Sequence, residues 1–99
     1  MKIRIELPFH LRNLAQTGRE VEVEVAAPVS LERVLDALEE RYPVLRGNIR
    51  NHHDKKRREL VRFFACEEDI SNDDPSLKLP AAVQAGKEPL IILGAIAGG

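Results

Sequence analysis

The clearest pattern in the sequence is an alternation of apolar and charged residues in two stretches near its beginning. Residues 2–7 alternate lysine, arginine or glutamate with isoleucine or leucine, and residues 20–25 alternate glutamate with valine. A period of two is typical of β-strands that bury one face. Pro8 ends the first strand and Gly18 provides the freedom to reverse direction, so residues 9–18 are predicted to form a loop or short turn. The two strands are therefore predicted to pair as an antiparallel hairpin with a wide loop.

A helical period replaces the alternation in residues 31–42. The apolar positions that form one stripe of this helix are Leu31, Val34, Leu35, Leu38 and Tyr42. Residues at these spacings lie on the same face of an α-helix. Ser30 is a good N-cap, Glu32 lies in the first turn, and Pro43 ends the helix. This helix is predicted to cover the apolar face of the sheet.

Two apolar stretches in the second half of the chain predict further strands. Residues 60–66 read as a strand, with a short edge strand expected near residues 69–71. Residues 90–93 are apolar at every position, which predicts a central strand with both faces covered. The predicted order is strand, strand, helix, strand, short strand, strand.

The predicted sheet carries more large apolar residues than one helix covers. These residues are Phe9, Phe63, Phe64, Ile91 and Leu93. Those that emerge on the outer face would form an exposed apolar patch, which on a small domain indicates a protein partner. The alternative is that the long loops cover them.

Length and composition restrict the class of protein. At 99 residues with 43% hydrophobic residues, the chain is expected to form one domain, residues 1–99, with a single modest core. The net charge is only −1, which gives no support for nucleic-acid binding. One cysteine, Cys66, excludes an intramolecular disulfide framework and fits a reducing compartment.

The same features argue against secretion and membrane insertion. Charged residues interrupt the apolar residues at the start, so no signal peptide is evident. Residues 90–97 form the longest apolar run, far short of the roughly 20 residues of a membrane helix. The chain is therefore expected to be a small cytoplasmic domain without a membrane partner.

Three features could carry chemistry. The basic segment within residues 46–59 is interpreted as a solvated loop, or alternatively as an electrostatic docking patch for an acidic partner. The adjacent pair His52 and His53 lacks a second pair of ligands, so no metal site is predicted. Cys66, within an apolar strand, is expected to be a small buried hydrophobe rather than a sulfur-carrying thiol.

The sequence ends on Gly98 and Gly99, a few residues after the last apolar strand. Glycine has no Cβ and passes through a narrow channel, so the Gly99 carboxylate could enter the active site of another enzyme. The alternative is an ordinary frayed end. No Ser/His/Asp set, paired-acid signature or phosphate-binding glycine loop is evident, so no catalytic site of its own is expected.

Several segments together resemble the ubiquitin-like sulfur-carrier family, which includes the small subunit of molybdopterin synthase and the thiamine sulfur carrier. The matching segments are Leu11-Arg12 with Gly18, residues 31–43 with their final Tyr-Pro, residues 62–70, and above all residues 86–99 with the terminal Gly-Gly. The resemblance covers nearly the whole chain and implies an α+β β-grasp fold with a mixed sheet of four or five strands and one main helix. Cys66-Glu67-Glu68 replaces a frequent Asn-Gly turn, so the local hairpin is expected to differ. Gly94 replaces a frequent proline, which is expected to loosen the exit of a flexible tail, residues 94–99.

The resemblance also implies a function. A ubiquitin-activating-type adenylyltransferase would use ATP to adenylate the Gly99 carboxylate, and a sulfur source would convert it to a thiocarboxylate. The sulfur would then pass to the large subunit of a synthase, with molybdopterin synthesis favoured and thiamine or cysteine synthesis open. Gly98, Ala97, Ile96 and Ala95 would thread into the partner, with Ile96 as an apolar anchor. The partner interface is expected at Phe9, Arg12 and Phe64. A ubiquitin-like modifier joined to lysines through Gly99, or a binding module with an inert tail, remains open.

Overall fold

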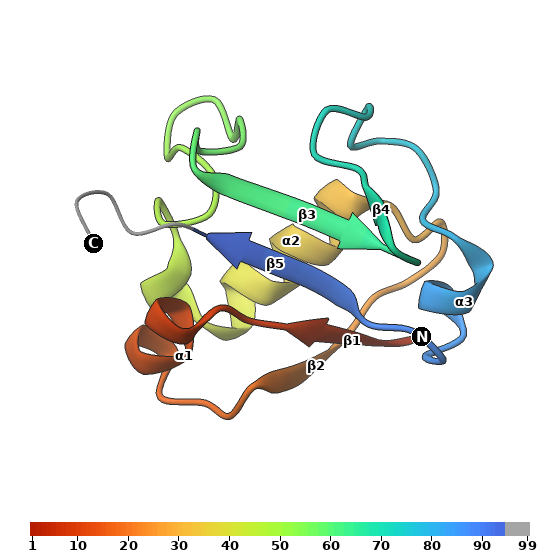
Figure 1. Ribbon diagram of the computed structural model, residues 1–99, viewed down its shortest axis with the longest axis horizontal. Coiled ribbons are helices and arrows are strands. Elements are labelled where there is room, and N and C mark those ends of the chain that lie inside the picture. The colour runs from red at the N-terminus through yellow and green to blue at the C-terminus, as the bar shows by residue number, and fades with distance from the viewer. Residues whose placement is uncertain (95–99) are drawn as a thin grey trace.

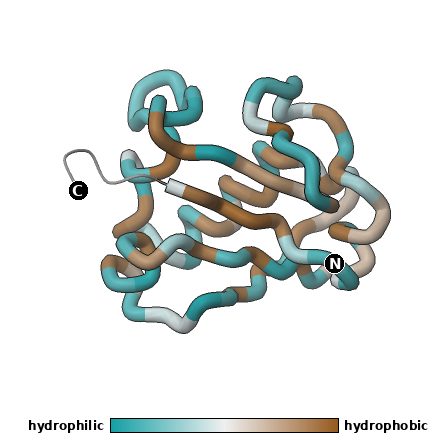
Figure 2. Tube along the Cα trace, viewed as in Figure 1, coloured by the Kyte–Doolittle hydropathy of each residue, from teal (hydrophilic) through white to brown (hydrophobic). Residues whose placement is uncertain are grey.

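The computed structural model describes residues 1–94 of the chain. Its elements, in order, are β1 (Lys2–Glu6), α1 (Phe9–Ala15), β2 (Glu20–Glu24), α2 (Leu31–Arg41), the 3₁₀ turn η1 (Pro43–Leu45), β3 (Val61–Ala65), β4 (Glu68–Asp69), α3 (Ala81–Gln84) and β5 (Leu90–Gly94). The elements form one sheet with α2 packed across one of its faces (Figure 1). The strands and α2 carry the apolar segments, while the loop before β3 is largely hydrophilic (Figure 2).

The sheet has five strands in the order β2-β1-β5-β3-β4. β1 pairs antiparallel with β2 and parallel with β5, and β3 pairs antiparallel with both β5 and β4. The predicted hairpin of the first two strands is therefore confirmed, as is the central position of the last strand. The parallel pairing of β1 with β5 makes the sheet mixed, as expected for a β-grasp fold.

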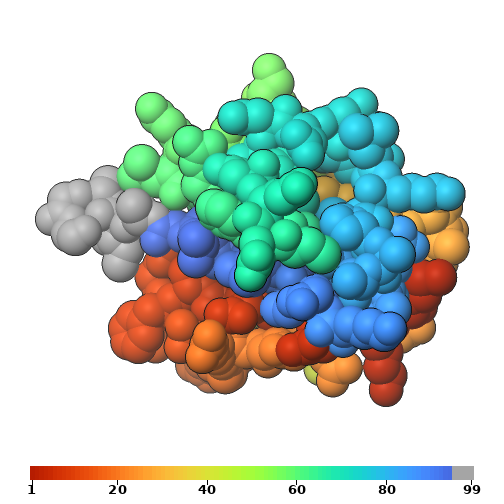
Figure 3. All heavy atoms as spheres, turned by 45° about the vertical axis from the view of Figure 1, so that its right-hand side comes forward, coloured from red at the N-terminus to blue at the C-terminus, as the bar shows by residue number. Residues whose placement is uncertain are grey.

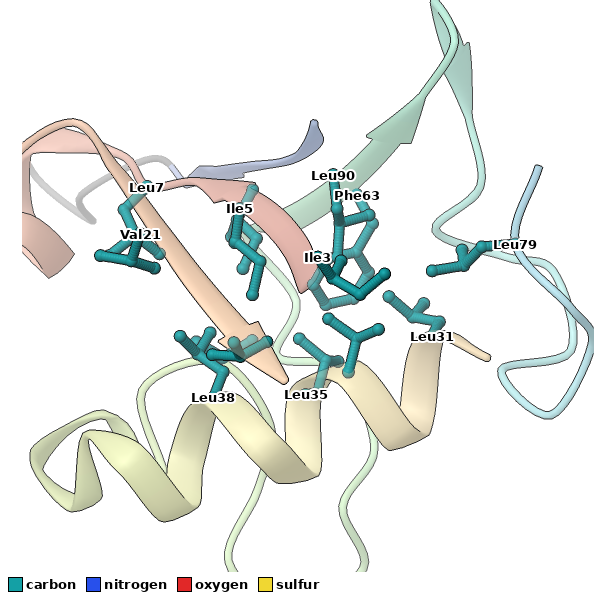
Figure 4. Close-up of a cluster of buried hydrophobic side chains, with 14 of the residues drawn as sticks. Ile3, Ile5, Leu7, Val21, Leu31, Leu35, Leu38, Phe63, Leu79 and Leu90 are labelled. Atoms are coloured by element: carbon teal, nitrogen blue, oxygen red, sulfur yellow. The ribbon is translucent and has the colours of Figure 1, made fainter. Parts of the chain in front are cut away.

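The core lies between the sheet and α2. The inward side chains of the strands and the apolar stripe of α2 meet there (Figure 4), and the largest of them include Ile3, Ile5, Leu35, Leu38, Phe63 and Leu90. The odd-numbered residues of β1 and β2 all face this core because side chains alternate along a strand. The two sequence periods thus specify which face of each element is buried.

Helix α2 begins and ends as the sequence predicts. The Ser30 side chain accepts a hydrogen bond from the backbone N–H of Arg33 at 3.4 Å, satisfying one of the free donors of the first turn. Tyr42 leaves the helical region, with φ −125° and ψ 78°, immediately before Pro43. A residue that precedes proline is disfavoured in the helical conformation, which explains the end of the helix.

Residues 9–15 form helix α1, so the prediction of a loop for residues 9–18 is wrong there. Leu11 is completely buried, and its packing in the hydrophobic core stabilises a helix that is too short to persist alone. Pro8 occupies the N-cap position without a side-chain cap, and Gln16 ends the helix in the left-handed conformation with φ 55°. The usual capping signals are absent, which is why the sequence pattern did not reveal α1.

Candidate functional site: the surface around the tail

The predicted reactive group lies beyond the described part of the chain. Gly99 and the residues expected to thread into a partner (Ala95, Ile96, Ala97 and Gly98) are all outside residues 1–94. The sequence predicts that Gly94 begins the flexible tail, whereas in the structure Gly94 is the last residue of β5. Five residues span at most about 17 Å when fully extended. An enzyme that binds Gly99 must therefore approach the surface around Gly94 closely.

Gly94 lies between two neighbouring elements. It pairs with Val61 of β3, and a Cβ built on Gly94 would lie only 2.8 Å from Cε1 of His10 in α1. Real Cβ atoms essentially never approach another atom so closely, so any larger residue requires the imidazole to move. The absence of a side chain at Gly94 therefore allows α1 to pack against the end of β5.

An apolar patch covers the outer face of the sheet next to this point. Ile91 and Leu93 of β5 lie beside β3, where Ile91 pairs with Phe64 and Leu93 with Arg62. Leu93 is 48% exposed, and Ile91 and Phe64 are half-buried. We call Phe64, Ile91 and Leu93 the outer-face patch; β5 reaches the surface in the space-filling view (Figure 3). The expectation that both faces of the last strand are covered is therefore wrong, because α2 covers only the inner face.

The five candidate patch residues divide between the two faces of the sheet. Phe63 points into the core and is only 2% exposed, so it is not among the residues that emerge on the outer face. Phe64 points the opposite way because consecutive residues of a strand alternate. Phe9 projects from α1 and is 67% exposed.

Arg12 supports Phe9 rather than lying free on the surface. Its Nε donates a hydrogen bond to the Leu7 carbonyl oxygen at 2.8 Å, and its guanidinium carbon lies 6.0 Å from the centre of the Phe9 ring. The first contact ties α1 to the end of β1, and the second is compatible with a cation–π interaction. Arg12 therefore helps to hold Phe9 in place, while Phe9 presents apolar surface to solvent.

Charged pairs border the outer-face patch. On the β1 side, Glu6 pairs with Ile91 of the patch, and its Oε1 lies 3.0 Å from Arg19 Nη2. On the β3 side, Arg62 lies 3.7 Å from Asp69, whose pKa is lowered mainly by hydrogen bonds from Ser71. An apolar centre with a charged rim is the usual anatomy of a protein–protein interface. The described surface is thus suited to binding another protein.

Cys66 is exposed, so the expectation that it is a buried hydrophobe is wrong. It forms, with Glu67, the two-residue turn between β3 and β4, and both residues have positive φ, 50° and 68°. This is the conformation that Asn-Gly adopts most readily, so the turn keeps its geometry although neither preferred residue is present. The expectation that the local hairpin differs from an Asn-Gly turn is therefore wrong for its backbone.

The described residues also form a cleft beside α2. This cleft of about 570 Å³ lies between α2 and the loops around residues 50–57 and 71–75, with Leu31, Leu35 and Phe63 among its lining. Its charged residues include the ion-paired Arg50 and Asp36.

Within residues 1–94, no cluster of three or more histidine, cysteine or acidic residues could hold a metal ion. Nor does any described helix have the length and apolar character to cross a membrane.

Comparisons with known proteins identify the fold. SAMP1 from Haloferax volcanii matches with a TM-score of 0.78 and 20% identity, covering 100% of each chain. CysO, in the crystal structure of the Amycolatopsis orientalis BexX/CysO complex, matches with a TM-score of 0.73 and 18% identity over 97% of this chain and 98% of that one. Small archaeal modifier protein 1 from Methanosarcina acetivorans matches with a TM-score of 0.71 and 20% identity, over 99% of this chain and 96% of that one.

These matches define the fold as the ubiquitin-like β-grasp fold, which confirms the predicted fold class. No protein-family model matches the chain, and no curated protein matches it significantly.

Proposed function

We propose that this protein is a sulfur carrier whose Gly99 carboxylate is activated by another enzyme. The observation that carries the proposal is the position of the end of β5. β5 ends at Gly94 beside the exposed outer-face patch, and small or apolar residues with the pair Gly98-Gly99 follow it in the sequence. The domain would bind a partner through this surface and place the carboxylate in the partner's active site.

The chemistry follows from the poor reactivity of a carboxylate. In the first step, a Gly99 oxygen attacks the α-phosphorus of ATP and pyrophosphate leaves, so the carboxyl carbon gains AMP as a leaving group. In the second step, a hydrosulfide ion released from the sulfur donor attacks that carbon, a C–S bond forms, AMP departs, and the S–H proton is lost. The resulting thiocarboxylate can then donate sulfur. In this scheme a ubiquitin-activating-type adenylyltransferase holds the ATP.

The similar structures support this proposal without selecting a pathway. CysO was solved as part of a complex with another protein, BexX, so a chain of this fold can dock on a partner. By analogy, we propose that the sulfur acceptor is the large subunit of a synthase. Molybdopterin synthesis is the favoured pathway because of the sequence resemblance, with thiamine or cysteine synthesis as alternatives.

A protein modifier is the second candidate function. Three of the similar structures are of proteins named small archaeal modifier protein 1 or SAMP1. A modifier would use the same adenylate, but a lysine amine would attack the carboxyl carbon in place of sulfur. The two functions therefore differ in the final nucleophile.

Intact mass spectrometry tests the proposal. The protein is incubated with the adenylyltransferase encoded by the same genome, ATP and a sulfur donor. The expected result is a mass gain equal to the exchange of one oxygen for one sulfur. Two matched controls, deletion of Gly99 and addition of one alanine after Gly99, should both abolish the gain because each removes or displaces the reactive carboxylate.

Comparison of the wild type with tail deletions distinguishes the carrier from the two alternative functions. A mass gain that survives deletion of Gly99 would refute the carrier proposal. A ladder of Gly99-dependent conjugates in cell lysate, without a thiocarboxylate, would establish the modifier. Unchanged partner binding and cell phenotype without Gly98 and Gly99 would indicate a binding module with an inert tail.

A further inference from the structure

A basic loop, residues 50–58, lies next to the point where the tail begins. The Val61 N–H donates to the Arg58 carbonyl oxygen at 3.0 Å, and Arg57 Nη1 donates to the Val61 carbonyl oxygen at 2.9 Å. Val61 in turn pairs with Gly94. Figure 1 shows the loop before β3 and the end of β5 at the same end of the molecule. The segment that the sequence suggested as a solvated loop or docking patch is thus a neighbour of the tail.

This loop is a folded structure and not a freely solvated chain. Arg50 and Arg57 form an antiparallel bridge, and the Arg58 N–H donates to the carbonyl oxygen of the fully buried Ile49 at 3.0 Å. Arg50 is only 6% exposed and donates to Glu39 and Asp36 of α2 at 2.9 and 2.8 Å. Arg50 therefore fixes the start of the loop to the domain.

Arg57 provides the second anchor of the loop. Besides Val61, it donates to the Ser71 carbonyl oxygen at 3.2 Å and to the Asn72 side-chain oxygen at 3.0 Å. These contacts tie the loop to the segment after β4. The charge of Arg50 is paired with Glu39 and Asp36, so the exposed residues Lys55, Lys56 and Arg58 contribute most of the positive charge at the surface of the loop.

The tip of the loop presents these lysines to solvent. The Asn51 N–H donates to the Lys56 carbonyl oxygen and the Lys56 N–H to Asp54 Oδ1, both at 2.9 Å, which closes the turn. Lys55 is exposed and lies 3.5 Å from Asp36, while the ammonium group of Lys56 has no ion-pair partner among residues 1–94. The turn therefore holds two cationic side chains at a defined position near the tail.

Part of the described surface has the opposite charge. Residues 67–74 contain acidic residues without any lysine or arginine, whereas the glutamates of β2 lie opposite the basic residues Lys2 and Arg4 of β1. The whole chain has a net charge of −1. The basic loop is thus a local positive region at the end of the molecule that a tail-binding enzyme must approach.

We propose that the basic loop docks on an acidic surface beside the tail channel of the adenylyltransferase. This inference rests on the proposed function and specifies how the partner is recognised. Opposite charges accelerate diffusional encounter, which matters most for a carrier that must bind and leave in each cycle. A nucleic acid fits less well, since the loop has no phenylalanine, tyrosine or tryptophan to stack on bases.

Charge reversal in the loop tests this inference. Lys55→Glu/Lys56→Glu is compared with Lys78→Glu/Lys87→Glu, which changes the net charge equally but acts on exposed lysines before and after α3. Initial rates of ATP–pyrophosphate exchange are measured with the same adenylyltransferase at low and high salt. The expected result for the loop variant is a kcat/KM about tenfold lower at low salt, an unchanged kcat, and a difference that disappears at high salt. The control pair and Lys55→Arg/Lys56→Arg should match the wild type.

Each of the following outcomes would overturn the inference. Equal losses in the loop and control pairs would show that only net charge matters. A loss that persists at high salt, or a lowered melting temperature of the loop pair, would indicate damage to the loop instead of lost steering. If the wild type itself shows no Gly99-dependent exchange, the proposed function fails and the inference falls with it. Salt-dependent binding of single-stranded or duplex RNA by the wild type, lost in the loop pair, would assign the loop to nucleic acid instead.

Discussion

The ion pairs of Arg50 provide the sharpest test of how this domain is held together. Arg50 is buried, and the Glu39 side chain that accepts its Nε hydrogen bond is only 12% exposed. Substitution Arg50→Met keeps a long unbranched side chain but leaves the Glu39 carboxylate without its partner. Breaking a buried ion pair in this way costs about 3–5 kcal/mol.

The lower end of this range applies here. Asp36, the second partner, is 52% exposed and can be solvated by water after Arg50 is lost. We therefore expect Arg50→Met to lower the free energy of unfolding by about 3 kcal/mol. For a domain of this size, that loss corresponds to a fall in melting temperature of roughly 12–20 °C.

The stability lost in Arg50→Met should depend on pH. Burial raises the pKa of Asp36, but the hydrogen bond from Arg50 and the charges of Arg50 and Lys55 outweigh it, so the pKa lies below its ordinary value of 3.8. A carboxyl group whose pKa is lower in the folded state contributes stability above its ordinary pKa and loses it as the pH falls through the folded value. The difference between wild type and Arg50→Met should therefore narrow as the pH falls below about 4.

Urea unfolding followed by far-ultraviolet circular dichroism at pH 7 and at pH 3.5 measures these differences. Arg46→Met is the matched control, because Arg46 is exposed and its side chain has no described hydrogen bond or ion pair. Arg50→Met/Glu39→Leu should regain most of the lost stability, since it removes the unpaired carboxylate. A loss below about 0.5 kcal/mol, an equal loss at both pH values, or no recovery in the double variant would refute the reasoning.

Three further predictions follow from the turn, the tail base and the outer-face patch. Cys66→Asn/Glu67→Gly should raise the free energy of unfolding by about 1 kcal/mol in urea titrations, because both residues tolerate positive φ. Gly94→Ala should destabilise the protein by about 1 kcal/mol through contact with the His10 ring, and His10→Ala should relieve most of this loss in a double-mutant cycle. Leu93→Ala should weaken binding to the adenylyltransferase by roughly tenfold or more in calorimetry while changing stability by less than about 1 kcal/mol.

The controls for these variants come from the same chain. Leu77→Ala removes a leucine that is 60% exposed and lies away from β5 in the sequence, so partner binding should be unchanged. Cys66→Asn/Glu67→Ala keeps the asparagine but not the glycine, and should give a smaller gain. An additive loss in Gly94→Ala/His10→Ala would rule out the proposed contact, and equal binding by Leu93→Ala and wild type would exclude the outer-face patch as the interface.

Much of the fold could be predicted from the sequence by itself, because its periods are local. The alternation in residues 2–7 and 20–25 determines two strands and their buried faces, and the stripe from Leu31 to Leu38 determines α2. The uniformly apolar run at 90–93 indicated a central strand, which is the position of β5 in the sheet. The terminal Gly98-Gly99 and the single Cys66 could likewise be identified from the sequence, although not the surroundings of either.

The tertiary structure decided the rest, because it depends on contacts between residues far apart in the chain. α1 is held by the buried Leu11 and by contacts with neighbouring elements, which no local period encodes. The outer face of β5 is open because one helix covers only one face of the sheet, and Cys66 is exposed because it occupies a turn. Strand pairing brings Val61 and the basic loop beside Gly94, and the packing of α1 brings the His10 ring to the same point.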